Sequence, residues 1–448
     1  GIRNYLYSDL IAALHHEKCE ILLLHSISKE AIEEINSVHK CSFKTYELPV
    51  YKETFIQKIL RETVCYARLL HNSRLVNNAT ILNTWKPNTK NFKKKLFYQF
   101  VKYIASFVSK KYDWILKLEE NHTKQVSRNY KNQRQLLKEI NPDVIFSTHQ
   151  RAMNAVPLVN AAKQLNIKTV GAIFSWDNLP KARLTVRTDE YLVWSDYMKN
   201  ELALYYPEIA EKLITVTGTP QFEFHKKHQF IIDKNLFFSR YHLDASKKII
   251  CFSGDDLRTS PFDPNYLDDI ASVIEKEKLN LQILLRRAPV DTSGRFDAIL
   301  LKYPAILKEA APIWNFDTDD ALNWQIIYPT YSDIELLIST AFYCEAVINV
   351  GSTMAHDFAL LNKPAVYINY NAVKSDVWNI ETIYKFQHFR SMGKLNPVLW
   401  LNSKNEIKKV LDVILENPTL DNHNWVDIIS ENRETASLNI AKKLIACT

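Results

Sequence analysis

One stretch of the chain combines residues that could bind a phosphate with residues that could bind a sugar. Val347–Val350 is a short, mostly apolar run typical of a buried strand, and Gly351 ends it with a residue suited to a tight turn. Ser352 and Thr353 then begin a helical pattern, so two hydroxyls and free backbone N–H groups point toward the carboxyl edge of a sheet. Asp357 lies one turn further on the same face and could accept hydrogen bonds from sugar hydroxyls. This pattern favours a nucleotide-linked ligand; an ordinary serine-capped crossover is the alternative.

The elements that must position these residues alternate along the chain. Short apolar runs and helical patterns follow one another, which predicts an α/β protein with parallel sheets covered by helices. A chain of 448 residues is too long for one ordinary core and favours two domains of about 200 residues each. Four of the seven glycines fall at or beside the ends of apolar runs, as at the ligand-facing edge of a doubly wound sheet. They are Gly171, Gly218, Gly254 and Gly351.

The segment Gly351–Val366 resembles the nucleotide-sugar signature of GT-B glycosyltransferases, through its letters G-S-T-M-A, F-A-L-L and P-A-V. The similarity is greatest to the group that builds bacterial surface carbohydrates such as capsule and O-antigen. That group is related to nucleotide-sugar 2-epimerases and to CDP-glycerol glycerophosphotransferases. The resemblance implies that Ser352 and Thr353 hold the donor phosphates. It also implies that Asp357, where many relatives carry Glu, reaches the ribose, and that His356 touches the phosphate or the sugar.

The same resemblance implies a GT-B fold, in which two Rossmann-like doubly wound domains face each other across a cleft. Residues 1–225 are expected to form the acceptor domain and residues 245–424 the donor domain, with a linker between them. Residues 425–448 are expected to form a last helix that crosses back to the first domain. Gly1–Leu6 resembles the turn and helix that follow a first strand, so we expect the natural N-terminus to be longer.

Three more residues of the second domain are predicted to line the donor site. Gly254 follows the strand 247–252 at the interdomain cleft. Arg286 follows the strand 281–285 and could clamp a phosphate through two hydrogen bonds, although an ion-paired arginine is the alternative. The resemblance places Tyr328 beside the nucleotide base.

Inverting glycosyl transfer needs a base that takes a proton from the acceptor hydroxyl. Two first-domain strands, 143–147 and 168–174, are each followed by polar residues that belong at the ligand-binding sheet edge. Asp177 is the predicted base and His149 the second candidate; a turn carboxylate and a structural histidine are the alternatives. Asp255 is a further candidate, which could equally bind acceptor hydroxyls. The other predicted acceptor contacts are Gln150, Arg151, Trp176 and Asn178.

The sequence predicts neither a metal site nor a membrane span. Asp317-Thr318-Asp319 spells the D-x-D triplet of the other large glycosyltransferase fold, but no clear strand precedes it, which favours a solvated loop. The six cysteines have no metal or redox spacing, so reduced thiols in a cytoplasmic protein are expected. We find no signal-peptide pattern and no uninterrupted apolar run of about 18 residues.

The segment Trp85–Lys111 differs from its surroundings, because it contains eight lysines, seven aromatic residues and no acidic residue. Phe100, Tyr103 and Phe107 would share one face of a helix. Such a helix suits an anionic membrane surface, and a core-packed helix with a solvated lysine side is the alternative. Nucleic acid is not an expected partner, because the net charge is only +7 and no binding motif accompanies the segment.

The sequence therefore predicts a glycosyltransferase that is peripheral to the inner face of the cytoplasmic membrane. It would move a sugar from a UDP- or CMP-linked donor to a hydroxyl of a surface polysaccharide or a lipid-linked glycan. Transfer is expected to proceed with inversion and without a metal or cofactor. The alternatives are a nucleotide-sugar 2-epimerase, a CDP-alditol phosphotransferase and a catalytically inactive glycan-binding scaffold.

Overall fold

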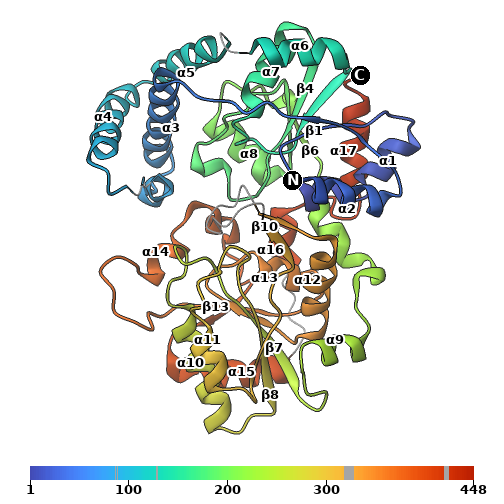
Figure 1. The fold of residues 1–448 in the computed structure, drawn as a ribbon. Helices are drawn as coiled ribbons and strands as arrows, with labels where there is room; N and C mark the ends of the chain where they lie inside the picture. The colour runs from blue at the N-terminus through green and yellow to red at the C-terminus, as the bar shows by residue number, and fades with distance from the viewer. Residues whose placement is uncertain (86, 88, 128–129, 317–326, 418–422) are drawn as a thin grey trace.

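The chain folds into two α/β lobes, one above the other in Figure 1, and both chain termini lie in the first lobe. The computed structural model describes residues 1–448 except 86, 88, 128–129, 317–326 and 418–422. The D-x-D triplet Asp317-Thr318-Asp319 lies outside the described residues. Within the described chain, no helix is both long and apolar enough to cross a membrane.

The first lobe is built on a parallel four-stranded sheet with the order β3-β4-β5-β6. These strands are β3 (Val144–Ser147), β4 (Lys168–Ala172), β5 (Glu190–Val193) and β6 (Ile214–Val216). A separate parallel pair comprises β1 (Leu22–His25) and β2 (Lys44–Glu47). The strands alternate with α1 (Leu10–His16), α2 (Lys29–His39), α7 (Ala155–Gln164) and α8 (Asp196–Tyr205).

A helical unit forms the outer edge of the first lobe (Figure 1) and comprises α3 (Phe55–Leu75), α4 (Phe92–Val108) and α5 (Tyr112–Val126). A capping box between Thr54 and Gln57 fixes the start of α3. α5 ends at Val126, and a second helix, α6 (Lys131–Ile140), follows it. The two helices bury their apolar faces on different partners, α5 on α3 and α6 on α7, so one straight helix cannot serve both.

The second lobe contains a parallel six-stranded sheet with the order β14-β13-β12-β7-β8-β9. From β7 the chain builds outward to β9, then returns to β12 and builds the other way, so the sheet is doubly wound with its switch point between β7 and β12. The strands are β7 (Lys248–Ser253), β8 (Leu281–Arg286), β9 (Leu307–Glu309), β12 (Val347–Asn349), β13 (Ala365–Ile368) and β14 (Leu399–Leu401).

Helices cover this sheet, and the antiparallel pair β10 (Trp314–Phe316) and β11 (Ile327–Pro329) lies outside it. β12 and β13 are fully buried, which explains their near-continuous apolar sequence. The helices are α10 (Asp263–Lys276), α11 (Asp297–Lys302), α12 (Tyr331–Tyr343), α13 (Met354–Ala359), α14 (Ile380–Tyr384) and α15 (Ile407–Glu416).

The segments that join the lobes are themselves packed. The linker forms the 3₁₀ turn Pro220–Lys226 and α9 (Lys234–Arg240), and Phe224 shares a hydrophobic cluster with residues of both lobes. The C-terminal segment is not one helix but two, α16 (His423–Ile429) and α17 (Ala436–Ile445). The chain turns between them at Asn432, which has a φ of +51°. α17 then packs on α1 and contributes to a cluster with the sheet of the first lobe.

Candidate functional site

The carboxyl ends of β7 and β12 meet at the switch point of the second lobe. β7 ends at Ser253 and β12 leads into Ser352, and the two hydroxyl oxygens lie 3.4 Å apart. The backbone N–H of Ser352 donates to Asn349 Oδ1 at 2.8 Å, which fixes the loop. Ser352 is half-buried and Thr353 is exposed. In doubly wound sheets this crevice is the usual place for a ligand.

α13 begins at Met354, two residues later than the sequence predicts. Thr353 is its N-cap residue, but the Thr353 side chain makes no cap hydrogen bond. The backbone N–H of Met354 donates instead to Ser352 Oγ at 3.4 Å. The Thr353 hydroxyl is therefore not used to cap the helix. It is suited to donate a hydrogen bond to an anionic ligand at this edge of the sheet.

Gly351→Ala is expected to destabilise the second lobe. Gly351 has a φ of +69°, where a Cβ atom costs about 1–2 kcal/mol. A Cβ atom here would also lie 2.8 Å from Phe389 Cζ. The melting temperature should fall, and Phe389→Leu in the same chain should recover the steric part of the loss but not the backbone part. An equal loss in both backgrounds would contradict the contact with Phe389.

Arg286 is ion-paired, which was the alternative to a free phosphate clamp. Its Nη2 donates to both oxygens of Asp333, at 2.9 and 3.0 Å. Asp333 also accepts from the backbone N–H of Ile313 and the indole N–H of Trp314, so this carboxylate is held in place. The Nη1 atom of Arg286 is buried, and none of the residues that the structure describes accepts a hydrogen bond from it. Asp333 therefore orients the guanidinium through Nη2 and leaves the Nη1 amino group for a ligand.

Arg3 belongs to the same site, although no sequence motif singled it out. Arg3 Nη2 donates to Gln221 Oε1 of the linker at 3.4 Å, and Asn4 Nδ2 donates to the same oxygen at 3.3 Å. The charges of Asp357 and Asp333 act on Arg3 from the second lobe. A signal was available, because Gly1–Leu6 was expected to follow a strand, which places Arg3 at a ligand-facing sheet edge.

Asp357 faces the linker in this structure. His225 Nε2 lies 3.0 Å from Asp357 Oδ1, and the His225 side chain is buried. A contact between Asp357 and a ribose would therefore compete with His225. The ribose role of Asp357 stays a prediction, and His225 is a second group that no sequence motif indicated.

His356 and Trp176 pack against other aromatic side chains where the two lobes meet. Trp176, from the loop after β4, lies 5.2 Å from the His356 ring, 4.8 Å from His388 and 5.8 Å from Trp425, measured between ring centroids. Burial lowers the pKa of His356 to about 4, and no residue in the described part of the chain forms a hydrogen bond with either ring nitrogen. The expected ligand contacts of His356 and Trp176 are not available in this arrangement, because both side chains are covered by neighbouring rings.

Tyr328 and Gly254 are both buried. The Tyr328 hydroxyl lies 2.9 Å from Ser28 Oγ of the first lobe, so this tyrosine links the two lobes. A Cβ atom at Gly254 would lie 2.9 Å from Phe296 Cζ, so close packing against that ring requires the glycine. The contact of Tyr328 with a nucleotide base stays a prediction.

Asp177 is held by its own turn, as the alternative interpretation expected. Ser175 Oγ donates to Asp177 Oδ1 at 2.7 Å, and Lys181 Nζ donates to Asp177 Oδ2. Burial pushes the pKa of Asp177 upward, but Lys181 and His388 outweigh burial and hold the pKa well below its usual value. A carboxylate so stabilised in its ionised form is a weak proton acceptor. This geometry argues against Asp177 as the base.

His149 stacks on Phe174 with ring centroids 4.6 Å apart. Its Nδ1 accepts from the backbone N–H of Arg151 at 3.0 Å, so the neutral ring carries its proton on Nε2. Burial lowers the pKa of His149 to about 3. With Nδ1 occupied and Nε2 protonated, this ring has no free acceptor, which argues against His149 as the base.

The residues next to His149 also form hydrogen bonds that stabilise the fold. Gln150 Oε1 accepts from the backbone N–H of Phe174 at 3.0 Å, and the Gln150 side chain is buried. Arg151 Nη2 donates to Asn178 Oδ1, which joins the two loops. Gln150 and Asn178 are buried and Arg151 is half-buried, and the acceptor contacts of all three residues stay predictions.

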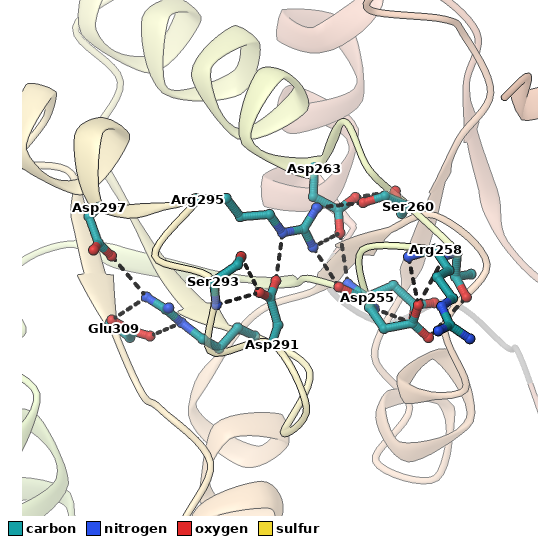
Figure 2. Close-up of polar contacts among 12 residues, drawn as sticks. Asp255, Arg258, Ser260, Asp263, Asp291, Ser293, Arg295, Asp297 and Glu309 are labelled. Carbon is teal, nitrogen blue, oxygen red and sulfur yellow. Dashed lines mark hydrogen bonds and ion pairs between the residues drawn. The ribbon is translucent and has the colours of Figure 1, made fainter. Parts of the chain in front are cut away.

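Asp255 lies two residues beyond Ser253, and its surroundings make it a strong proton acceptor. Its backbone N–H donates to Asp263 Oδ2 at 2.7 Å. Its backbone carbonyl accepts from Arg295 Nη2 at 2.6 Å. Figure 2 shows that Arg295 is also engaged by Asp291 and by the Ser260 carbonyl, so this guanidinium is largely committed to other partners. Burial raises the pKa of Asp255 to about 8, and the charges of Asp256 and Asp263 add to the rise.

Glu201 of α8 is a second carboxyl group with a raised pKa, and no sequence pattern pointed to it. Both carboxyl oxygens are buried, and neither forms a hydrogen bond with any residue of the described ranges. Burial raises the pKa of Glu201 to about 8, and the nearby charge of Asp177 adds to the rise. The carboxyl group of Glu201 is thus protonated at neutral pH. It therefore contributes no negative charge, although a count of acidic residues in the sequence would include one.

Solved structures of nucleotide-sugar enzymes share this architecture. MnaA from S. aureus, solved with UDP, shares 10% identity at a TM-score of 0.53, and the match covers 100% of this chain and 94% of that chain. A UDP-GlcNAc 2-epimerase from Neisseria meningitidis, bound to UDP-GlcNAc, shares 12% identity at a TM-score of 0.51, over 98% and 96% of the chains. A glycosyltransferase from Rickettsia africae shares 11% identity at a TM-score of 0.50, over 99% and 96%.

No protein-family model matches the sequence, and no curated protein matches it. The likeness to solved structures is one of fold, since identities of 10–12% carry no activity with them. It extends over nearly the whole length of both partners in each comparison. The chain therefore has the GT-B-like fold of these proteins, with two Rossmann-like domains.

Proposed function

We propose that the protein is a glycosyltransferase that binds a nucleoside diphosphate sugar at the switch point of its second lobe. The observation that carries the proposal is the pair of serine hydroxyls, Ser253 and Ser352, at the carboxyl ends of adjacent strands. Arg286, on the next strand, adds a buried Nη1 group that bonds to no described residue, and Arg3 adds a positive charge from the first lobe. Hydroxyls and guanidinium groups on one edge suit a diphosphate.

In the proposed reaction Asp255 accepts the proton of the acceptor hydroxyl. The acceptor oxygen forms a bond to the anomeric carbon on the face opposite the phosphate, and the bond from that carbon to the diphosphate oxygen breaks. The nucleoside diphosphate leaves with the electron pair, and its negative charge is stabilised by Arg3 and Arg286. The scheme inverts the anomeric centre and uses no metal.

The acceptor is proposed to be a hydroxyl of a surface polysaccharide or a lipid-linked glycan, and the donor is proposed to be UDP- or CMP-linked. The similarity of the segment Gly351–Val366 to enzymes of surface-carbohydrate synthesis supports this assignment. The UDP and UDP-GlcNAc bound in two proteins of the same fold support UDP. A CMP-linked sugar has one phosphate rather than two and would engage fewer of the donors described.

A thermal-shift panel of UDP, GDP, CMP and dTDP, with sugar derivatives of each, tests the donor site. The true donor should stabilise the protein by about 2.7 kcal/mol when present at 100 times its dissociation constant. Ser352→Ala should weaken that nucleotide about 10–100-fold, because a hydrogen bond to a charged phosphate is lost. Ser272→Ala is the matched control, since Ser272 lies on α10 and its hydroxyl donates to the Asp269 carbonyl of the same helix. A panel without any shift would refute the proposal.

A nucleotide-sugar 2-epimerase is the second candidate, and the fold shared with two proteins solved with UDP or UDP-GlcNAc favours it, one of them a 2-epimerase. The two activities separate when the protein is incubated with UDP-GlcNAc and no acceptor. An epimerase converts the configuration at C2 and keeps the sugar on the nucleotide, which proton NMR detects. A transferase leaves the configuration at C2 unchanged. With no acceptor present, it slowly transfers the sugar to water and releases UDP.

A further inference from the structure

α4 exposes a continuous stripe of large apolar side chains. Five of them are between 51% and 78% exposed: Phe92, Leu96, Phe100, Tyr103 and Phe107. Their spacing of three and four residues places them within an arc of about 80° at about 100° per residue. The set, called here the α4 stripe, is thus one face of the helix rather than scattered positions. Contiguous exposed apolar faces of this kind mark interaction sites.

The α4 stripe is not the face that packs in the fold. Val101 and Ala105 point to the opposite side of the helix and are fully buried. Val101 joins a cluster with Leu69 of α3, and Ala105 joins a cluster with Ile115 of α5. α4 therefore has two apolar faces, and packing inside the lobe accounts for only one of them.

Positive charge borders the α4 stripe at both ends. Lys93, Lys94 and Lys95 are exposed in the first turn, and Lys102 is exposed in the middle. At the other end Phe107 stacks on Trp114 with ring centroids 4.9 Å apart. The ammonium groups of Lys110 and Lys111 lie over these rings, 5.6 and 5.1 Å from the centroids. No acidic residue occurs between Trp85 and Lys111.

We propose that the α4 stripe docks on an anionic lipid bilayer, with α4 lying in the plane of the interface. The exposed aromatic and aliphatic side chains enter the boundary between headgroups and acyl chains, and the lysines contact anionic headgroups. Exposed Phe55 and Ile56 extend this surface, because Phe55 contacts Phe97 at a centroid distance of 5.7 Å. Charge complementarity identifies the partner, since a neutral apolar partner would leave the flanking lysines unpaired.

Vesicle sedimentation tests this surface with the full-length chain. The protein should bind vesicles of equimolar phosphatidylcholine and phosphatidylglycerol at about 0.1 M salt, and binding should weaken steeply toward about 1 M, where the Debye length falls to about 3 Å. Replacement of Lys93 and Lys95 by Gln should weaken binding about 25-fold, at roughly fivefold for each charge. Phe100→Ser with Tyr103→Ser should weaken binding at least as much, because the insertion is lost.

The control is Leu301→Ser with Val377→Ser, two apolar residues of the second lobe that are 81% and 95% exposed. This variant should bind vesicles like the parent chain, and circular dichroism should show that all variants are folded. Equal binding to pure phosphatidylcholine vesicles, or unchanged binding of the α4 variants, would overturn the proposal. A dimer in sedimentation velocity that the Phe100 and Tyr103 substitutions dissociate would also overturn it, since a second copy would then cover the stripe. The assay contains no nucleotide, so its failure leaves the proposed transferase activity standing.

Discussion

Asp255→Asn is expected to lower the rate of sugar release from the donor about 10²–10⁴-fold, the usual contribution of a positioned general base. The substitution keeps the side-chain shape, and the backbone N–H of Asp255 still donates to Asp263. The affinity for the nucleoside diphosphate should stay within about threefold, because the donors proposed for the diphosphate are Ser352, Arg3 and Arg286. UDP release measured against donor concentration separates the two quantities.

The pH dependence gives a readout that a purely structural role would not produce. Because the pKa of Asp255 is raised to about 8, the rate should rise with pH through that value as the carboxyl group ionises. Asp256→Asn removes a negative charge that raises the pKa of Asp255, so the rise should move to lower pH in that variant. The amide oxygen of the substituted side chain can still accept from the backbone N–H groups of Arg258 and Thr259, as the carboxylate of Asp256 does. An unchanged pH profile in this variant would show that Asp255 is not the general base.

Much of the second lobe could be predicted from local sequence, because its strands are buried on both faces. Such strands appear as unbroken apolar runs, and the turn at Gly351 follows directly from one of them. In the structure β7 and β12 are neighbours in the sheet, which brings Ser253 and Ser352 to adjacent positions. The position of the proposed donor site, at the carboxyl edge of a doubly wound sheet, can thus be predicted from local sequence patterns.

The partners of charged side chains could not be predicted in the same way. Asp177 and Arg286 are candidates because each follows a strand, and the structure keeps both at a sheet edge. Lys181 and Asp333 then neutralise their charges, and the second pairing spans 47 positions of the chain. Which partner an ionised group meets depends on the packing of distant elements, and that choice decides whether the group can act as a base or as a free clamp.

The interdomain residues could not be predicted for a related reason. The sequence predicts that Trp176 contacts the ligand because it follows a strand of the first lobe, and that His356 does so because the segment around it resembles the nucleotide-sugar signature. When the edges of two sheets face each other, side chains from one lobe fill space in the other, and Trp176 packs against His388 and Trp425. A single sequence does not show which edge residues meet the other lobe and which meet the ligand. α4 poses the opposite problem, since both of its faces are apolar and only Val101 and Ala105 are buried.

Arg68→Met is expected to lower the free energy of opening the helical unit α3–α5 by about 3–5 kcal/mol, the usual cost of leaving a buried charge unpaired. Arg68 is buried on α3 and donates to Glu119 of α5, to Glu208 at 2.9 Å and to the Tyr112 hydroxyl at 2.7 Å. Arg187 donates to the same two carboxylates, so four charges balance in one network. Without Arg68 the network keeps two carboxylates and one guanidinium.

Hydrogen exchange of the α3 and α5 amides measures this opening separately from the unfolding of the rest of the chain. Glu119→Gln in the Arg68→Met background restores the charge balance and should recover part of the loss, whereas a loss that stays complete would show that packing rather than charge is responsible. Burial alone would raise the pKa of Glu119, but Arg187 and Arg68 lower it from 4.5 to about 2. The ionised carboxylate therefore contributes on the order of 3 kcal/mol above its unfolded pKa, and this contribution is lost as the pH falls toward about 2. The difference between the parent chain and Arg68→Met should shrink over the same range. Because this network attaches α3 and α5, which pack against α4, to the rest of the first lobe, Arg68→Met should also weaken vesicle binding without changing the nucleotide-induced thermal shift.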